Sequence, residues 1–382
     1  MISERRAKRL KKRKKRIISI ILIIFIVLIG YFLVNNQFIK GLYYKAGNPI
    51  SDNNPIITLN ESISPKFIRF KNVLITTSGN NITAYNIKGE QVEFNKFSTI
   101  SASVSHYNNL NLKACDDYVI AYDKGGVGAI VFNNNKITAT ININSKIIFA
   151  KPFNNGEFLV IAEDSNAKNQ VILYSYDGKE KFKWHSGVNN ILDATYSAAT
   201  NKLVIVTSEL STGIFNSKII FFDISNADPY SEMTFENTFF TNINFYNKNN
   251  IIVLSDVGTY YFNVNGELIN SYNFNNKMLT CYKQLSNGSI ALSFGSKSGN
   301  GTVVEVVNNK GNLVGSYESE YDILNIDSDN GNILICSLRE VILLSKNGML
   351  LRKIDYNKDL QKAFFLKNKF VLIGNSEIRI VN

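Results

Sequence analysis

Residues 251–272 read IIVLSDVGTYYFNVNGELINSY, and this stretch contains the pattern that decides the fold. Two short apolar runs, Ile251–Ser255 and Thr259–Val264, are followed by the turn Asn265-Gly266-Glu267 and a third run, Leu268–Tyr272. Runs rich in Val, Ile, Tyr and Phe that are bounded by Asn, Asp and Gly are typical of β-strands joined by tight turns. The stretch therefore predicts three strands of a small antiparallel sheet.

The same unit recurs along the chain. The equivalent turns are marked by Gly89, Asn134, Gly178, Asn226, Gly266, Gly311 and Gly348, which step by 45, 44, 48, 40, 45 and 37 residues. A further apolar run precedes many units, as at Phe67–Phe70 and Ile323–Ile326. Four strands repeated about every 40–45 residues are the signature of a β-propeller. In the first unit, Gln91–Phe94 is the strand expected after the turn.

Several runs are apolar at consecutive positions, such as Ile219–Phe222 and Val341–Leu344. Successive side chains of a strand point to opposite faces of its sheet, so both faces of these sheets must be buried. Blades stacked around an axis meet that requirement, because each sheet is covered by its neighbours. Two tandem β-sandwiches are the alternative, although they more often show strict alternation.

The chain ends with three strands, Ala363–Leu366, Phe370–Ile373 and Glu377–Val381, and Ile56–Leu59 can supply the fourth strand of that sheet. This pairing would close the ring and leave no open edge. Residues 56–382 divided among eight blades give about 41 residues each. We therefore predict an all-β fold, an eight-bladed β-propeller, with no helix beyond the amino-terminal segment. Seven blades are the alternative if the long unit around 211–236 is misread.

The net charge of +11 is concentrated at the amino terminus. Residues 1–16 contain ten Lys and Arg and one Glu, so they carry +9 and the other 366 residues carry only +2. The nearly neutral body argues against a nucleic-acid-binding domain. We expect the basic tail to contact anionic lipid headgroups, which attract Lys and Arg. Its cations nearest the apolar run are Lys11, Lys12, Arg13, Lys14, Lys15 and Arg16.

Ile17–Val34 is an uncharged run of 18 residues, long enough for a helix that spans the bilayer core. The basic tail on one side predicts that residues 1–16 lie in the cytoplasm and the remainder outside. A cleaved signal peptide is the alternative, but its apolar region is usually shorter and is followed by small residues. We predict an uncleaved transmembrane helix at 17–34, a stalk at 35–55 rich in Asn, Gly and Pro, and a propeller at 56–382.

The sequence contains few residues that could carry chemistry. Neither His106 nor His185 has a Cys, His or acidic neighbour at metal-ligand spacing, so we predict no metal and no cofactor. Gly125–Gly128 lies between two strands and opens no helix, which predicts a turn and not a phosphate site. The single Trp184 is expected to pack on an outer strand. Three scattered cysteines indicate free thiols: Cys115, Cys281 and Cys336.

Charged residues gather in the connections between the second and third strands of the units. In a propeller, these connections all lie on one face. The candidate interaction face consists of Asp123, Lys124, Glu163, Asp164, Asp256, Arg339 and Glu340. The functional hypothesis is a mixed-charge recognition surface; the plainer interpretation is that these charges only solvate turns.

The whole chain resembles a family of single-pass membrane proteins of clostridial-type bacteria, the domain of unknown function 5711. The resemblance rests on the basic start, the single apolar span, and a propeller that contains Tyr122-Asp123-Lys124-Gly125-Gly126. It implies a bacterial surface propeller and supplies no catalytic residues.

The sequence favours a non-enzymatic propeller that is held on the outer side of the cytoplasmic membrane. It would bind a protein, a peptide or a component of the cell envelope. The alternative is an extracytoplasmic enzyme of the quinoprotein or propeller-lyase type, which the absence of clustered His, Trp and carboxylates disfavours. A third hypothesis assigns nucleic-acid binding to residues 1–16 alone.

Overall fold

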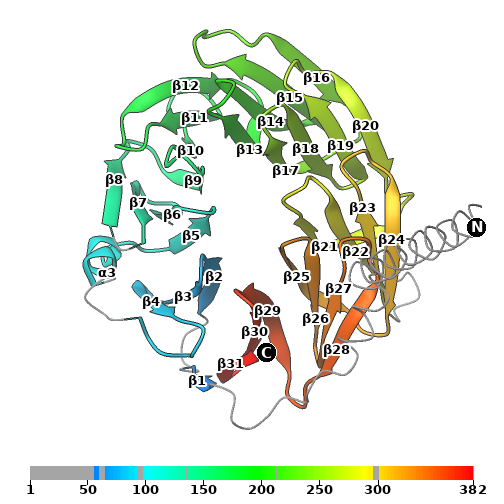
Figure 1. Cartoon of the computed structure of the whole chain (residues 1–382). Helices are drawn as coiled ribbons and strands as arrows, with labels where there is room; N and C mark the ends of the chain where they lie inside the picture. The colour runs from blue at the N-terminus through cyan, green and yellow to red at the C-terminus, as the bar shows by residue number, and fades with distance from the viewer. Residues whose placement is uncertain are drawn as a thin grey trace, which may run out of the picture.

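The computed structural model describes residues 56–59, 65–92, 98–134, 136–211, 213–295 and 301–381. They form eight antiparallel sheets arranged as blades around one axis (Figure 1), which confirms the all-β, eight-bladed β-propeller. The predicted tail, transmembrane helix and stalk at 1–16, 17–34 and 35–55 lie outside these residues. Within the described part of the chain, no helix is both long and apolar enough to cross a membrane.

The first four blades follow the chain in order. Blade 1 contains β2 (Lys66–Phe70), β3 (Val73–Ser78) and β4 (Asn81–Tyr85). Blade 2 contains β5 (Leu110–Ala114), β6 (Val119–Asp123), β7 (Gly128–Asn133) and β8 (Lys136–Asn142). Blade 3 contains β9 (Ile147–Pro152), β10 (Phe158–Glu163), β11 (Asn169–Tyr174) and β12 (Glu180–Ser186). Blade 4 contains β13 (Asn190–Ser197), β14 (Lys202–Ser211), β15 (Ile214–Asp223) and β16 (Ser231–Phe235).

The other four blades complete the ring. Blade 5 contains β17 (Phe240–Asn247), β18 (Asn250–Ser255), β19 (Gly258–Asn263) and β20 (Leu268–Asn273). Blade 6 contains β21 (Met278–Gln284), β22 (Ile290–Gly295), β23 (Thr302–Val307) and β24 (Leu313–Ser319). Blade 7 contains β25 (Ile323–Asp329), β26 (Asn332–Ser337), β27 (Glu340–Leu344) and β28 (Leu350–Asp355). Blade 8 contains β29 (Leu360–Leu366), β30 (Lys369–Gly374), β31 (Glu377–Val381) and β1 (Ile56–Thr58).

The strands of each blade are ordered from the centre outward, with the first strand of the blade nearest the axis (Figure 1). Alternate connections therefore lie on opposite faces of the ring. We call the face with the turns between second and third strands the loop face; it includes Lys124, Asp164 and Asp256. We call the face with the turns between first and second strands the mouth face; it includes Asp116 and Lys248.

The ring is closed by β1, which pairs with β31 so that Ile56 lies opposite Arg379 and Thr58 opposite Glu377. The Leu59 N–H also donates to the Ser376 carbonyl in the turn before β31. Because that turn is on the loop face, β1 runs from the mouth face to the loop face. The chain thus enters the ring at Ile56 on the mouth face.

Blade 1 differs from the expectation of four strands. Gln91 makes only an isolated bridge with Tyr85, and residues 93–97 lie outside the described part. A short helix, α3 (Ser98–Val104), packs against β4. Its Ser101 hydroxyl donates to the Ile82 carbonyl and accepts from the Ile82 N–H, both at 3.2 Å, so a helix covers the strand edge. The expectation of no helix in the ring was wrong here.

The apolar runs bury both sides of their sheets, as predicted. Along β10, Phe158 and Val160 belong to a core cluster shared with blade 2. The alternate residues Leu159 and Ile161 belong to a second cluster shared with blade 4. Alternate side chains of one strand thus pack against the two neighbouring blades. Consecutive positions are apolar because both of these interfaces are buried.

The glycine markers occupy the turns between third and fourth strands. Gly178 and Gly266 have φ of 85° and 87°, a region that residues with a Cβ rarely adopt. The Gly178 N–H donates to the Ser175 carbonyl and the Gly266 N–H to the Asn263 carbonyl, at 2.9 and 3.1 Å. The repeat found in the sequence is therefore a repeat of turn geometry.

Six inner strands carry a β-bulge, which adds one residue relative to the second strand. The extra residues are Ile148, Leu192, Thr241, Thr280, Leu324 and Gln361. A bulge re-aims the side chains that follow it. Among the residues that follow are Lys151, Asp193, Asn242 and Asp327, which lie around the centre of the ring.

Candidate functional site

The seven residues of the candidate interaction face lie in the turns between second and third strands or at the adjoining strand ends. Two of their carboxylates have the same local role. Asp123 accepts the Asn109 N–H at 2.7 Å, and Asp256 accepts the Phe239 N–H at 2.9 Å. Each carboxylate therefore holds the connection that enters its own blade. A side chain at Gly126 would overlap the Asp123 carboxylate, so this turn requires glycine.

Arg339 and Glu340 are also engaged locally. Glu340 is only 3% exposed and forms an ion pair with Lys353 on the next strand, which raises the pKa of that lysine. The Arg339 Nε donates to an Asp359 oxygen at 2.8 Å. Glu163 and Lys124 are exposed at the ends of their strands. Four of the seven charges, those of Asp123, Asp256, Arg339 and Glu340, are thus engaged by partners within the ring.

Asp164 has a partner that the sequence did not reveal. Its carboxylate lies 2.5 Å from Nδ1 of His185, which is half exposed on β12. The Asn166 N–H and His185 together lower the pKa of Asp164. Asp164 is 21 residues from His185 and lies beyond metal-ligand spacing, so no pattern in the sequence indicated this pair. It forms because the β10–β11 connection lies beside the end of β12. The pair lines a cavity of about 430 Å³ together with Gln170 and Lys183.

Exposed apolar side chains on the loop face were missed by the sequence reasoning. The hairpin of β14 and β15 has ten-residue strands, and near its end Leu210 is 60% exposed and Phe215 is 47% exposed. The Phe215 ring contacts Phe239, with 5.2 Å between the ring centroids. Other exposed apolar residues in turns of this face are Val127, Val188, Tyr321 and Leu338. The only available signal was the unusual length of this unit.

Two cavities lie at the mouth face, around the centre of the ring. The larger one, of about 840 Å³, is bordered by inner strands β2, β5, β25 and β29, and the other, of about 600 Å³, by β5, β9, β13 and β17. Both include Lys113. Their lining contains three carboxylates, Asp116, Asp327 and Asp329, against seven cations, which gives +4: Arg69, Lys71, Lys113, Lys151, Lys248, Lys283 and Lys367. Charge of one sign is thus concentrated in a body that carries only +2.

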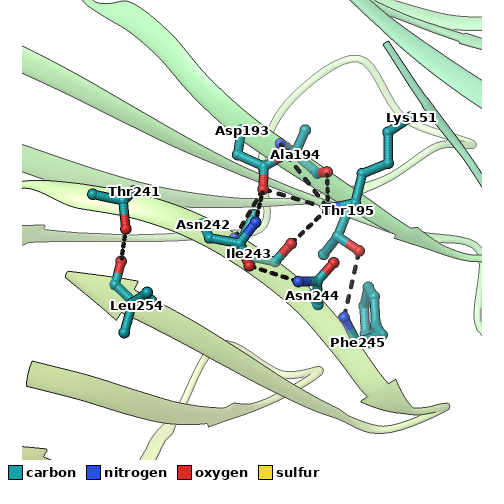
Figure 2. A network of polar contacts seen from close by, with 10 residues as sticks. All are labelled: Lys151, Asp193, Ala194, Thr195, Thr241, Asn242, Ile243, Asn244, Phe245 and Leu254. Carbon is teal, nitrogen blue, oxygen red and sulfur yellow. Dashed lines mark hydrogen bonds and ion pairs between the residues drawn. The ribbon is translucent and has the colours of Figure 1, made fainter. Parts of the chain in front are cut away.

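A buried network between blades 3, 4 and 5 forms the wall of the smaller cavity (Figure 2). The Lys151 ammonium lies 3.3 Å from Asp193 and donates to the Ile243 carbonyl at 2.8 Å. Asp193 also accepts from the N–H groups of Ala194 and Ile243 and from the Asn242 amide, at 2.8–3.0 Å. Burial lowers the pKa of Lys151 and outweighs the attraction of Asp193.

A second network repeats this arrangement in blades 7 and 8. Asp327 accepts the Phe365 N–H of the next inner strand at 2.9 Å, as Asp193 accepts that of Ile243. It also pairs with Lys283 at 2.9 Å and lies 3.7 Å from Arg69. In both networks an inner-strand carboxylate joins its blade to the next one and neutralises a cation.

The cysteines and the tryptophan singled out in the sequence are buried or partly buried in the ring. Cys115, Cys281 and Cys336 are free thiols, and burial raises the pKa of Cys336 to about 12. Trp184 is partly buried on outer strand β12, where it packs against Phe222. Among the described residues, no group of three or more His, Cys, Asp or Glu side chains could hold a metal ion.

The ring is similar to several solved propellers that share little sequence with it. BamB from Moraxella catarrhalis is 11% identical, with 87% of this chain and 98% of that chain covered and a TM-score of 0.51. The carboxy-terminal WD40 domain of Sif2 is 14% identical, with coverage of 88% and 98% and a TM-score of 0.56. The quinohemoprotein alcohol dehydrogenase ADHIIG from Pseudomonas putida HK5 is 8% identical, with coverage of 89% and 79% and a TM-score of 0.55.

These likenesses show the fold, because a propeller scaffold serves many unrelated activities. No curated protein matches the sequence. A family defined by sequence does match, over residues 53–382, and this range contains every described strand of the ring. The chain therefore belongs to the family of unknown function DUF5711.

Proposed function

We propose that this protein is a membrane-tethered, non-enzymatic binding module whose propeller lies outside the cytoplasmic membrane and binds a protein partner. The tether is the apolar run at 17–34, and the basic residues before it orient the chain with the propeller outside. The rigid ring supplies the binding surface.

One observation carries the choice of a protein partner: the exposed apolar side chains at the end of the β14–β15 hairpin. Leu210, Ile214 and Phe215 are all more than 40% exposed there. Exposed apolar groups that are rimmed by polar residues mark interaction sites in soluble domains. Glu209 on β14 and Asp256 in a turn supply polar groups on the same face. Aromatic and aliphatic anchors of this kind supply most of the binding energy at protein interfaces.

The binding proposal is tested by photo-crosslinking in cells. A crosslinking residue at Phe215 should capture one defined protein, and the double change Leu210→Ser with Ile214→Ser should abolish the product. The control places the same residue at Leu268, which is 42% exposed on outer strand β20. Equal capture from both positions, or none from Phe215, would refute the loop face as the binding surface.

The location is tested separately. Alkaline phosphatase fused after Asn382 should be active, because the enzyme needs an oxidising compartment for its disulfides. A fusion to a cytoplasmic reporter such as β-galactosidase should be inactive. The reverse result would place the propeller in the cytoplasm without affecting the binding test.

A further inference from the structure

The 600 Å³ cavity between blades 2 and 5 has an unusual lining. Three lysines border it, Lys113, Lys151 and Lys248, and none of its lining residues is an Asp or Glu. Its other polar groups are amides and hydroxyls of Asn154, Asn155, Asn242, Asn244, Asn247, Thr195, Tyr196 and Ser197. A cavity whose charged groups are all cations is complementary to an anion.

Lys113 and Lys248 are the two cations in this cavity that have no ion pair among the described residues, and Lys113 is the one on an inner strand. Among the described residues it takes part in no ion pair, and its ammonium lies 5.5 Å from the centre of the Phe149 ring. Lys283, which lines the neighbouring cavity on another inner strand, is paired with Asp327 at 2.9 Å. Lys113 is exposed, so its charge is available to a molecule that enters the cavity.

Lys151 is the second lysine of this lining, and its ammonium is held by Asp193 at 3.3 Å and by the Ala194 and Ile243 carbonyls. Asp193 accepts three further hydrogen bonds, from the Ala194 and Ile243 N–H groups and the Asn242 amide. Lys113 lies close enough to disfavour the charged form of Lys151 and so contributes to its lowered pKa. Asp193 is thus the partner of Lys151, and no ion pair joins it to Lys113 among the described residues. The Asp116 carboxylate accepts the amide of the lining residue Asn154 at 2.9 Å.

The cavity also has half-buried aromatic walls, formed by Phe149, Phe153, Phe245 and Tyr246. A bare ion would leave these apolar surfaces without a partner. We propose that the cavity binds a small organic phosphate, with the phosphate at the exposed Lys113 ammonium and the carbon-bearing part against the aromatic walls. Charge-assisted hydrogen bonds from ammonium groups are the usual means of holding a phosphate.

This site is on the mouth face, whereas the proposed protein-binding surface is on the loop face. A negative result for one proposal therefore leaves the other unaffected. The phosphate can come from a free metabolite or from a lipid headgroup, since both present the same group at a surface. The tests below separate the two sources.

The test is isothermal titration calorimetry on the full chain in a zwitterionic detergent. The two probes are glycerol 3-phosphate and short-chain phosphatidylglycerol below its micelle concentration, and short-chain phosphatidylcholine is the reference lipid. Lys113→Gln should weaken binding by about tenfold, as expected for the loss of one charge-assisted contact. The matched control is Lys136→Gln, which removes an exposed lysine from outer strand β8 and should bind as the unchanged protein does.

Preference for glycerol 3-phosphate assigns the site to a free phosphate, and preference for phosphatidylglycerol over phosphatidylcholine assigns it to a headgroup. Binding should weaken as salt is added, because exposed charges are screened. The proposal is overturned if neither probe binds, or if Lys113→Gln and Lys136→Gln change the affinity equally. Equal urea midpoints for the two variants ensure that a loss of binding is not a loss of folding.

Discussion

On the loop face, Asp123, Asp256 and Glu340 are all bonded within their own blades, and the side chains left exposed there include Leu210 and Phe215. On the mouth face, most of the charged residues that line the cavities are cations, and most of the uncharged polar ones are asparagines. Charge in a loop is therefore a poor guide to function in this ring, because a turn uses its carboxylates to satisfy backbone N–H groups. The positive charge around the cavities lies on the inner strands and in the turns that follow them.

The largest effect on stability should come from the buried network of Lys151 and Asp193 on the inner strands. Asp193→Ala should lower the free energy of unfolding by about 3–5 kcal/mol, because it leaves the buried Lys151 ammonium without its carboxylate. Urea denaturation followed by tryptophan fluorescence measures the loss. Lys151→Met combined with Asp193→Ala should cost less than the sum of the single changes. If the two losses simply add, the buried pair is not coupled.

The next largest effect is a loss of folding stability at low pH, which comes from Glu377 on the loop face. Burial alone would raise the pKa of Glu377, but hydrogen bonds from Lys358, Tyr356 and Arg379 outweigh it and lower the pKa from 4.5 to about 2. Ionised Glu377 therefore stabilises the folded state fully above pH 4.5, its ordinary pKa, and this stabilisation is lost as the pH falls towards 2. We expect about 2–3 kcal/mol from this group.

Glu377→Gln should remove that part of the pH dependence, as measured by urea midpoints between pH 2 and pH 6. Asp359→Asn is the matched control, because its carboxylate pairs with Arg339 but is 45% exposed. If the two variants have the same pH profile, the loop face does not use its carboxylates as described here.

A smaller effect distinguishes two neighbouring residues of the candidate interaction face. Asp123→Ala should cost about 1–2 kcal/mol, because the Asn109 N–H loses the buried Asp123 carboxylate as its acceptor. Lys124→Ala should change stability by less than about 0.5 kcal/mol, as is usual at exposed positions. Thermal unfolding of the two variants gives the comparison. Similar losses would mean that Asp123 is not holding the turn.

The smallest expected effect is on the mouth face. Lys113→Gln should leave the free energy of unfolding within about 0.5 kcal/mol of the original, since no ion pair of Lys113 exists among the described residues. Urea denaturation at low salt checks this. A clear loss of stability would show that Lys113 supports the fold, and the contrast between the two faces would then weaken.

Much of the ring could be predicted because its determinants are local. Asn265-Gly266 specifies a turn through the φ that only glycine adopts readily, and Phe158–Ile161 specifies burial on both sides through consecutive apolar residues. The helix α3 was missed because its sequence, STISASV, is rich in Ser and β-branched residues, which favour helices weakly.

The candidate site was harder to predict because its partners are far apart in the chain. Lys151 and Asp193 are 42 residues apart, and Asp327 and the Phe365 N–H are 38 apart. These separations are about the length of one blade. The residues come into contact only when neighbouring inner strands lie side by side. Nothing near Asp193 in the sequence distinguishes it from Asp123. The bulge before Asp193, which turns it towards the centre, has no residue signature.

The closing strand β1 determines how the ring would respond to a mechanical load. The chain enters at Ile56, so tension along the preceding residues reaches the propeller through a strand of three residues paired only with β31. The other joints of the ring are covalent connections between blades. Ile57, packed in the cluster with Leu366 and Ile378, is the main apolar anchor of this strand. Under sufficient force β1 should detach first, and blade 8 would then open while the other seven blades stay assembled.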